Sequence, residues 1–239
     1  MRVAMHQPHY LPWLGLIDKA DRSDLFVVLD HVQYERRGWQ NRNYVAAKNG
    51  PVLLTVPVIH GTRDARILDK TINNEQPWRE KHRRTLDEHC YRGAPFWTRF
   101  REGILRPYTA EWDRLADLAM ATTRFALDAF GIRTPVVLSS ELGEFPGHKS
   151  ELLAQIAAKV GATTMLSGDG ARGYVDTDVF RRHGVAVEWQ DFRHPRYPQH
   201  NRAGADFLPR MAALDLLVNV GPVAGLRLLR EARAASGSG

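Results

Sequence analysis

Short apolar runs and helix-like repeats of apolar residues alternate along the chain. Residues 2–5 and the continuous apolar run 25–29 predict strands, and the apolar positions at three- and four-residue spacing within 13–20 predict a helix between them. A run that is apolar at every position suits a strand buried on both faces of a parallel sheet. The first thirty residues therefore predict a strand–helix–strand unit with a right-handed crossover.

The rest of the chain repeats this alternation. Further strands are expected at 52–58, 135–138, 163–166 and 185–189, and helices at 78–89, 110–130, 152–160, 177–183 (capped by Asp176), 207–218 and 222–233. We predict a Rossmann-like α/β fold, with a mostly parallel sheet, helices on both faces, and a helical or irregular insertion at about 76–108. The prediction is a single domain over residues 1–235, followed at 236–239 by a flexible tail or a remnant of cloning.

Composition narrows the class of protein. The 239 residues are 44% hydrophobic and 25% charged, which excludes a disordered chain, a collagen and a coiled coil. A single cysteine, Cys90, can form no internal disulfide, and no apolar run reaches the roughly 18 residues that span a bilayer. We therefore expect a cytoplasmic protein. The net charge of +6 favours anionic partners such as nucleotides, nucleotide-sugars, tRNA or acidic lipid headgroups.

The segment HQPHYLPWLG, residues 6–15, is the most informative stretch. Its prolines stiffen a loop that leaves the carboxyl end of the first strand, where ligands bind in open parallel sheets. The following helix start also favours an anion. We expect His6 and His9 to act on a ligand here, with Gln7 and Tyr10 as binding residues. The alternative, that each histidine is only a satisfied polar residue, stays open.

Polar residues also follow the second strand. Asp30 closes it, and such a carboxylate can accept hydrogen bonds from a ribose, hold a metal-bound phosphate or orient a histidine. Amides and guanidiniums farther along could bind carboxylate, phosphate or sugar hydroxyls, and the candidates are Gln33, Asn41, Arg42 and Asn43. A polar hairpin is the alternative for residues 36–43. A divalent ion held by His6, His9, Asp30 and His31 is a further alternative, but no metal site is assigned.

A glycine-rich loop after the strand 163–166 is the second candidate binding segment. Its glycines let backbone N–H groups approach a ligand, and its arginine can pair with a phosphate or carboxylate. The residues are Ser167, Gly168, Asp169, Gly170, Arg172 and Tyr174. A plain turn is the alternative, and the loop lacks the Lys-Ser/Thr of a Walker motif. Lys149 at a helix start and Tyr197 in a polar loop complete the candidate binding residues.

Several of these motifs together resemble one protein family. They are HQPHYLPWLG, the strand from Asp24 to Asp30, VQY, WQNRN, SELGEFPGHKSELL, LSGDGARGYVD, HPRYPQ and FLPRMAALDLLVNVG, which occur in order over nearly the whole chain. The sequence is thereby identified as similar to the WbqC-like protein family. Members of this family are associated with gene clusters for O-antigen, other surface polysaccharides and specialised metabolites. The resemblance therefore implies a role in the biosynthesis of such compounds. One departure is Ala212, where the family pattern usually has serine, so a role for that serine is in doubt here.

The residues and the family resemblance together predict an enzyme, a transferase or ligase, that acts on an activated anionic donor. The group transferred would be nucleotidyl, acyl or aminoacyl, and the cofactor would be a nucleotide or another phosphate-bearing donor. His6 or His9 would act as acid, base or phosphate donor, and Asp30 would orient them. A distant analogy with nucleotidyltransferases of the HIGH type supports paired imidazoles in such a loop. The alternative is a non-catalytic RNA-binding or scaffold protein, with residues 78–106 as its surface and tRNA as a partner.

Overall fold

The computed structural model describes residues 1–62, 64–202 and 204–234. The expected tail at 236–239 lies outside the described residues. Within the described ranges, no helix has both the length and the apolar character needed to cross a membrane.

A five-stranded parallel sheet forms the centre of the fold, in the order β5-β2-β1-β6-β7. Its strands are β1 (Arg2–His6), β2 (Leu25–Val28), β5 (Val136–Leu138), β6 (Thr164–Ser167) and β7 (Ala186–Trp189). The predicted α/β, Rossmann-like fold is confirmed, and each of these strands lies within a residue or two of its predicted position.

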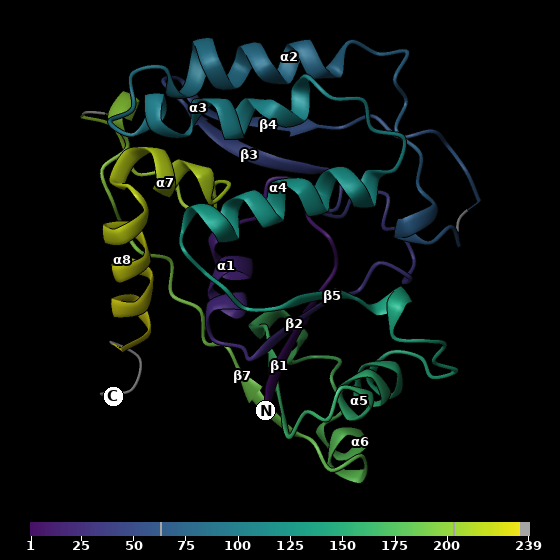
Figure 1. The fold of residues 1–239 in the computed structure, drawn as a ribbon. Coiled ribbons are helices and arrows are strands. Elements are labelled where there is room, and N and C mark those ends of the chain that lie inside the picture. Colours follow the sequence, from purple (N-terminus) through teal and green to yellow (C-terminus); the bar gives the residue numbers. More distant parts are fainter. Residues whose placement is uncertain (63, 203, 235–239) are drawn as a thin grey trace.

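Alternating side chains of the central strands pack into two separate cores. Ala4 of β1 faces one core, whereas Val3 and Met5 face the other. The first core is covered by α1 (Leu14–Asp21), α4 (Leu115–Ala129), α7 (Leu214–Val220) and α8 (Pro222–Ala234). The second is covered by α5 (Ser150–Lys159) and α6 (Thr177–Arg182), so helices lie on both faces of the sheet (Figure 1).

A third core lies beyond the carboxyl ends of the strands. It is built on an antiparallel hairpin of β3 (Arg42–Ala47) and β4 (Gly50–Thr55), with α2 (Trp78–Arg84), a π-helix (Thr85–Tyr91) and α3 (Trp97–Leu105) beside it (Figure 1). Short 3-10 helices complete the chain at Ile67–Asp69, Arg106–Tyr108, Ser139–Glu141, Asp169–Ala171 and His200–Arg202. The segment 76–108 is thus mostly helical, and Trp78, Tyr91 and Trp97 are buried in this core.

Three sequence predictions need correction here. No strand was predicted at residues 42–47, which form β3, and the strand expected at 52–58 is β4, which spans Gly50–Thr55. The helix expected from 110 begins at Leu115, because Thr71 pairs with Arg114 in a β-bridge that holds the preceding residues extended. The helix expected from 207 begins at Leu214, because Ala212 forms a bridge with Trp13.

The order of the strands fixes where a ligand would bind. From β1 the chain fills one side of the sheet with β2 and β5, and then returns to the other side of β1 with β6 and β7. The connections after β1 and β6 therefore leave the sheet on opposite sides, and in open parallel sheets the carboxyl ends of two such strands are the usual position for a ligand. The His6 loop and the Ser167 loop leave the sheet at this point.

Candidate functional site

Two histidine rings meet at the end of β1. His6 is the last residue of the strand, and His9 follows after Pro8; their ring centroids are 4.4 Å apart and the rings are perpendicular. Leu11, two residues after His9, adopts a left-handed backbone conformation with φ of 51°, which is strained for a leucine and is held in place by its neighbours. Asn43 Nδ2 donates to the Leu11 carbonyl, and the Leu11 N–H donates to Thr122 Oγ1.

A lysine that the sequence analysis missed completes this group. Lys19 of α1 is 8% exposed, and its Nζ donates to the Met5 carbonyl at 3.4 Å. A β-carbon added to Gly168 would lie 3.2 Å from Nζ, so the ammonium reaches the end of β6 as well. No carboxylate among the described residues forms an ion pair with Lys19. The sequence gives only a weak signal for Lys19, which lies among apolar residues of a predicted helix. In the structure, residues 14–20 of that helix are all buried.

These three groups are basic but unequally charged. Burial, and then the charge of Lys19, lowers the pKa of His9 to about 3, and burial with His9 and Lys19 lowers the pKa of His6 well below its ordinary value. Burial lowers the pKa of Lys19 to about 8, while Asp169 and Asp18 act in the opposite direction. At pH 7 two neutral imidazoles therefore flank one ammonium.

Hydrogen bonding sets the imidazole tautomers. Nδ1 of His6 lies 2.9 Å from the Gln7 carbonyl, which can only accept, so Nδ1 carries the proton and Nε2 holds a lone pair. Nδ1 of His9 is buried and has no hydrogen-bond partner in the described part of the chain. A buried polar atom without a partner is costly, which is a reason to expect a ligand or water there.

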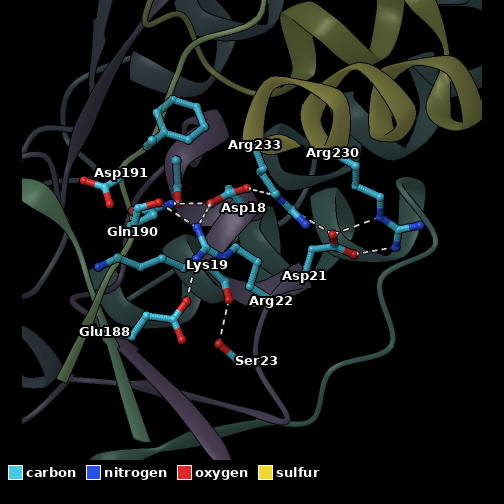
Figure 2. Close-up of polar contacts among 12 residues, drawn as sticks. Asp18, Lys19, Asp21, Arg22, Ser23, Glu188, Gln190, Asp191, Arg230 and Arg233 are labelled. Carbon is cyan, nitrogen blue, oxygen red and sulfur yellow. Dashed lines mark hydrogen bonds and ion pairs between the residues drawn. The ribbon is translucent and has the colours of Figure 1, made fainter. Parts of the chain in front are cut away.

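Lys19 is held beside a network of charged groups on α1 (Figure 2). The adjacent Asp18 is fully buried and accepts from Arg233 of α8 and from Gln190 Nε2, the latter at 2.7 Å. Gln190, just after β7, also donates to the Gly15 carbonyl at 2.7 Å. Asp18 thus fixes α1 against both α8 and the end of β7, and α1 carries Lys19.

The loop after β6 lies against the loop after β7. Asp169 accepts from the backbone N–H groups of Asp191 and Phe192. Arg172 pairs with Asp191 at 2.5 Å and with Asp169 at 3.4 Å, and its guanidinium lies 4.7 Å from the Trp189 ring centroid. A ligand would have to take Arg172 from two carboxylates. In the same loop Ser167 is buried, whereas Gly170 and Tyr174 are exposed.

Asp30 belongs to a second polar group, one strand away from His6. Its carboxylate accepts from Ser139 Oγ at 2.9 Å and from the Ser140 backbone N–H at 3.0 Å, both from the segment after β5. Ser139 Oγ also lies 2.5 Å from Nδ1 of His31. Asp30 thus orients His31 through Ser139, and among the described residues no hydrogen bond or ion pair joins it to His6 or His9.

The remaining predicted site residues are dispersed. Several are held in structural contacts. Asn41 donates to the Val56 carbonyl, Tyr10 bonds His82 and Tyr108, and Tyr197 bonds Asp215, all buried; the half-buried Gln7 accepts from Gln40. Others lie at the surface: Arg42 stacks over Trp39, Gln33 is exposed beside Arg66, and Lys149 is exposed at the start of α5 with φ of 52°. The structure therefore brings together His6, His9 and Gly168, with Asp169 nearby.

Metal and cysteine chemistry find no support in the geometry. Among the described residues no three His, Cys, Asp or Glu side chains could hold a metal ion. Burial raises the pKa of the Cys90 thiol to about 12, so it stays protonated. An open hollow between the end of α4 and α8, lined by Phe130, Val223 and Leu226, lies away from these basic groups.

Comparison with known proteins agrees with the sequence motifs. The model of the WbqC-like protein family matches residues 7–226. The chain is similar to the uncharacterised protein Rv1507c of Mycobacterium tuberculosis, with 31% identity over 221 residues, which cover 92% of this chain and 94% of that protein. No solved structure matches the chain at a significant level.

Proposed function

Because the chain belongs to the WbqC-like protein family, we propose that it is a transferase whose anionic donor binds between β1 and β6. The observation that carries this proposal is the group of His6, His9 and Lys19 at the strand-order reversal of the sheet. Lys19 is buried and forms no ion pair with a carboxylate of the described residues, and Asp169 and Asp18 act on its charge only from beyond contact distance. An anionic ligand in contact with the ammonium would therefore stabilise it. The donor would be a nucleotide, a nucleotide-sugar or another phosphate-bearing compound.

Each group has a distinct role in this proposal. Lys19 binds the charged part of the donor, and Gly168 leaves room for its ammonium. Nδ1 of His9, which has no hydrogen-bond partner among the described residues, forms a hydrogen bond to the donor. His6, with a lone pair on Nε2, takes up a proton from solvent water as the anion approaches and then donates it to charge that develops during transfer. The group transferred would be nucleotidyl, acyl or aminoacyl, in polysaccharide or specialised-metabolite biosynthesis.

Binding of RNA through residues 78–106 has less in its favour. The aromatic side chains of Trp78, Tyr91 and Trp97 are buried, so they have no face on which a base could stack. Arg83 and Arg101 already pair with Glu80 and Asp87. An aminoacyl-tRNA remains a donor worth including in the test below.

Isothermal titration calorimetry tests the proposal by measuring the affinity of the protein for five probes: ATP, UDP-glucose, acetyl-CoA, inorganic pyrophosphate and aminoacyl-tRNA. Lys19→Met should abolish binding of whichever probe binds, whereas Lys159→Met, which changes an exposed lysine on α5, should leave it unchanged. Affinity should fall as the pH rises through about 8, because Lys19 then loses its proton. Failure of every probe to bind, or equal binding by the Lys19 variant, would refute the donor site.

A further inference from the structure

A second group of polar residues lies one strand from the proposed donor site. β2 and β5 are neighbours, with Val28 opposite Leu138, so Asp30 and Ser140 lie two residues beyond the last pair at the carboxyl edge. β1 adjoins β2 on its other side, and the Leu29 N–H donates to the His6 carbonyl at 2.8 Å. A compound held here would therefore lie beside a donor at His6.

Hydrogen bonds around Ser139 determine where its proton points. The Asp30 backbone N–H lies 3.2 Å from Ser139 Oγ and can only donate, whereas the Asp30 carboxylate at 2.9 Å can only accept. The single hydroxyl proton of Ser139 therefore goes to the carboxylate. The remaining neighbour of Oγ, Nδ1 of His31 at 2.5 Å, must then be a donor.

This arrangement leaves Nε2 of His31 with the lone pair. Nε2 is buried and forms no hydrogen bond with any described residue, whereas the His31 side chain as a whole is partly exposed. The Phe145 ring lies 6.3 Å away, on the segment that leads into α5. Burial lowers the pKa of the imidazole below its ordinary value of 6.5; the charge of Arg66 lowers it as well, and that of Asp30 raises it. His31 is therefore neutral at pH 7.

We propose that His31 is the general base that activates the acceptor for the transferase, with Ser139 and Asp30 as positioning residues. The inference rests on the proposed function. The acceptor is a hydroxyl or amine compound that binds at the Nε2 edge of the His31 ring, beside Phe145. Its O–H or N–H bond breaks, and the proton passes to Nε2. The freed oxygen or nitrogen bonds to the phosphorus or carbonyl carbon of the donor, and the leaving group departs with the electron pair, held by Lys19.

Nitrogen NMR of ¹⁵N-histidine-labelled protein tests the tautomer without any substrate. At pH 7.5 the His31 signals should be those of a neutral ring with the proton on Nδ1. Ser139→Ala should move a large part of the population to the Nε2–H form, since nothing then accepts from Nδ1; an alanine is smaller than the serine it replaces and fits the buried position. A protonated ring, or an Nε2–H ring in the unaltered protein, would overturn the proposal.

Slow hydrolysis of the bound donor, with water as the acceptor, tests the catalytic role. His31→Gln should retain the donor affinity measured by titration but lose about 100-fold or more in the hydrolysis rate. His89→Gln, at an exposed histidine, should keep both. A His31 variant that binds and hydrolyses the donor like the unaltered protein would overturn the role of His31 alone. Absence of donor binding in the unaltered protein is a different result, which would remove the proposed function and the catalytic inference with it.

Discussion

The ammonium of Lys19 lies so close to the backbone of Gly168 that a β-carbon there would be 3.2 Å from Nζ and 3.3 Å from Cε. Two elements far apart in sequence, α1 and the loop after β6, therefore meet through a residue without a side chain. Gly168 has an ordinary extended backbone, with φ of −73° and ψ of 153°, so space and not conformation calls for glycine. The contact connects the two candidate binding segments.

Gly168→Ala should weaken donor binding while leaving the fold intact. The added methyl pushes the flexible end of Lys19 aside, and we expect roughly tenfold lower affinity, equivalent to about 1.4 kcal/mol, by titration with the tightest-binding probe. Gly170→Ala is the matched control, because a β-carbon there meets nothing within 4 Å. Equal losses in both variants would argue against a specific role for the Lys19 contact.

Arg233 of α8 should stabilise the protein more than other arginines of the same helix. Its guanidinium pairs with the fully buried Asp18, so Arg233→Met leaves a buried carboxylate short of a partner. We expect the free energy of unfolding in urea to fall by about 3 kcal/mol. Arg227→Met removes only an exposed pair with Glu231 and should change it by less than about 0.5 kcal/mol. Similar values for the two variants would contradict this account.

The protein should lose stability in acid through His9. Unfolding returns its imidazole to a pKa near 6.5, whereas burial in the folded protein lowers the pKa to about 3. Between these values the unfolded chain binds more protons, so the free energy of unfolding falls as the pH drops from 6.5 towards 3, by up to roughly 5 kcal/mol from this group. Urea titrations of His9→Gln should give a flatter pH profile than the unaltered protein; parallel profiles would show that His9 is not buried and neutral.

Tyr197 should prove structural, although the sequence singled it out as a binding residue. Its hydroxyl donates to the buried carboxylate of Asp215 at 2.9 Å, which also accepts from Gln199 at 2.7 Å. Tyr197→Phe should lower the free energy of unfolding by about 1.5 kcal/mol, because that carboxylate loses a donor. Donor affinity should stay as it was, and a variant with normal stability but weakened binding would restore Tyr197 to the site.

The sequence was informative about the parallel sheet because each of its strands is short and strongly apolar. The pattern at 25–29 shows burial on both faces, and the helices of the second half end at glycines such as Gly131 and Gly184, both with positive φ. β3 was harder to find, since its sequence RNYVAA begins with polar residues. Asn43 donates to the loop of His6 and Asn41 to the end of β4, and these tertiary contacts leave no periodic signal.

The candidate site was only partly visible for a related reason. Histidines beside prolines form a recognisable sequence motif. Lys19 lies in a helix of ordinary sequence, and its burial follows only from the packing of α1 against α8 and the sheet. The same holds for His31, whose tautomer depends on Ser139, more than a hundred residues away. Conversely Arg172, a natural anion ligand in sequence, is already paired with Asp169 and Asp191.

The position of β1 between β2 and β6 has a consequence for synthesis of the protein. Residue 2 pairs with residue 164, so the middle strand of the sheet gains its second neighbour only after most of the chain has left the ribosome. Until then one edge of β1 exposes unpaired backbone groups, and the two binding segments remain apart. Contacts so distant in sequence slow folding, and we expect the nascent chain to need protection from aggregation until β6 arrives.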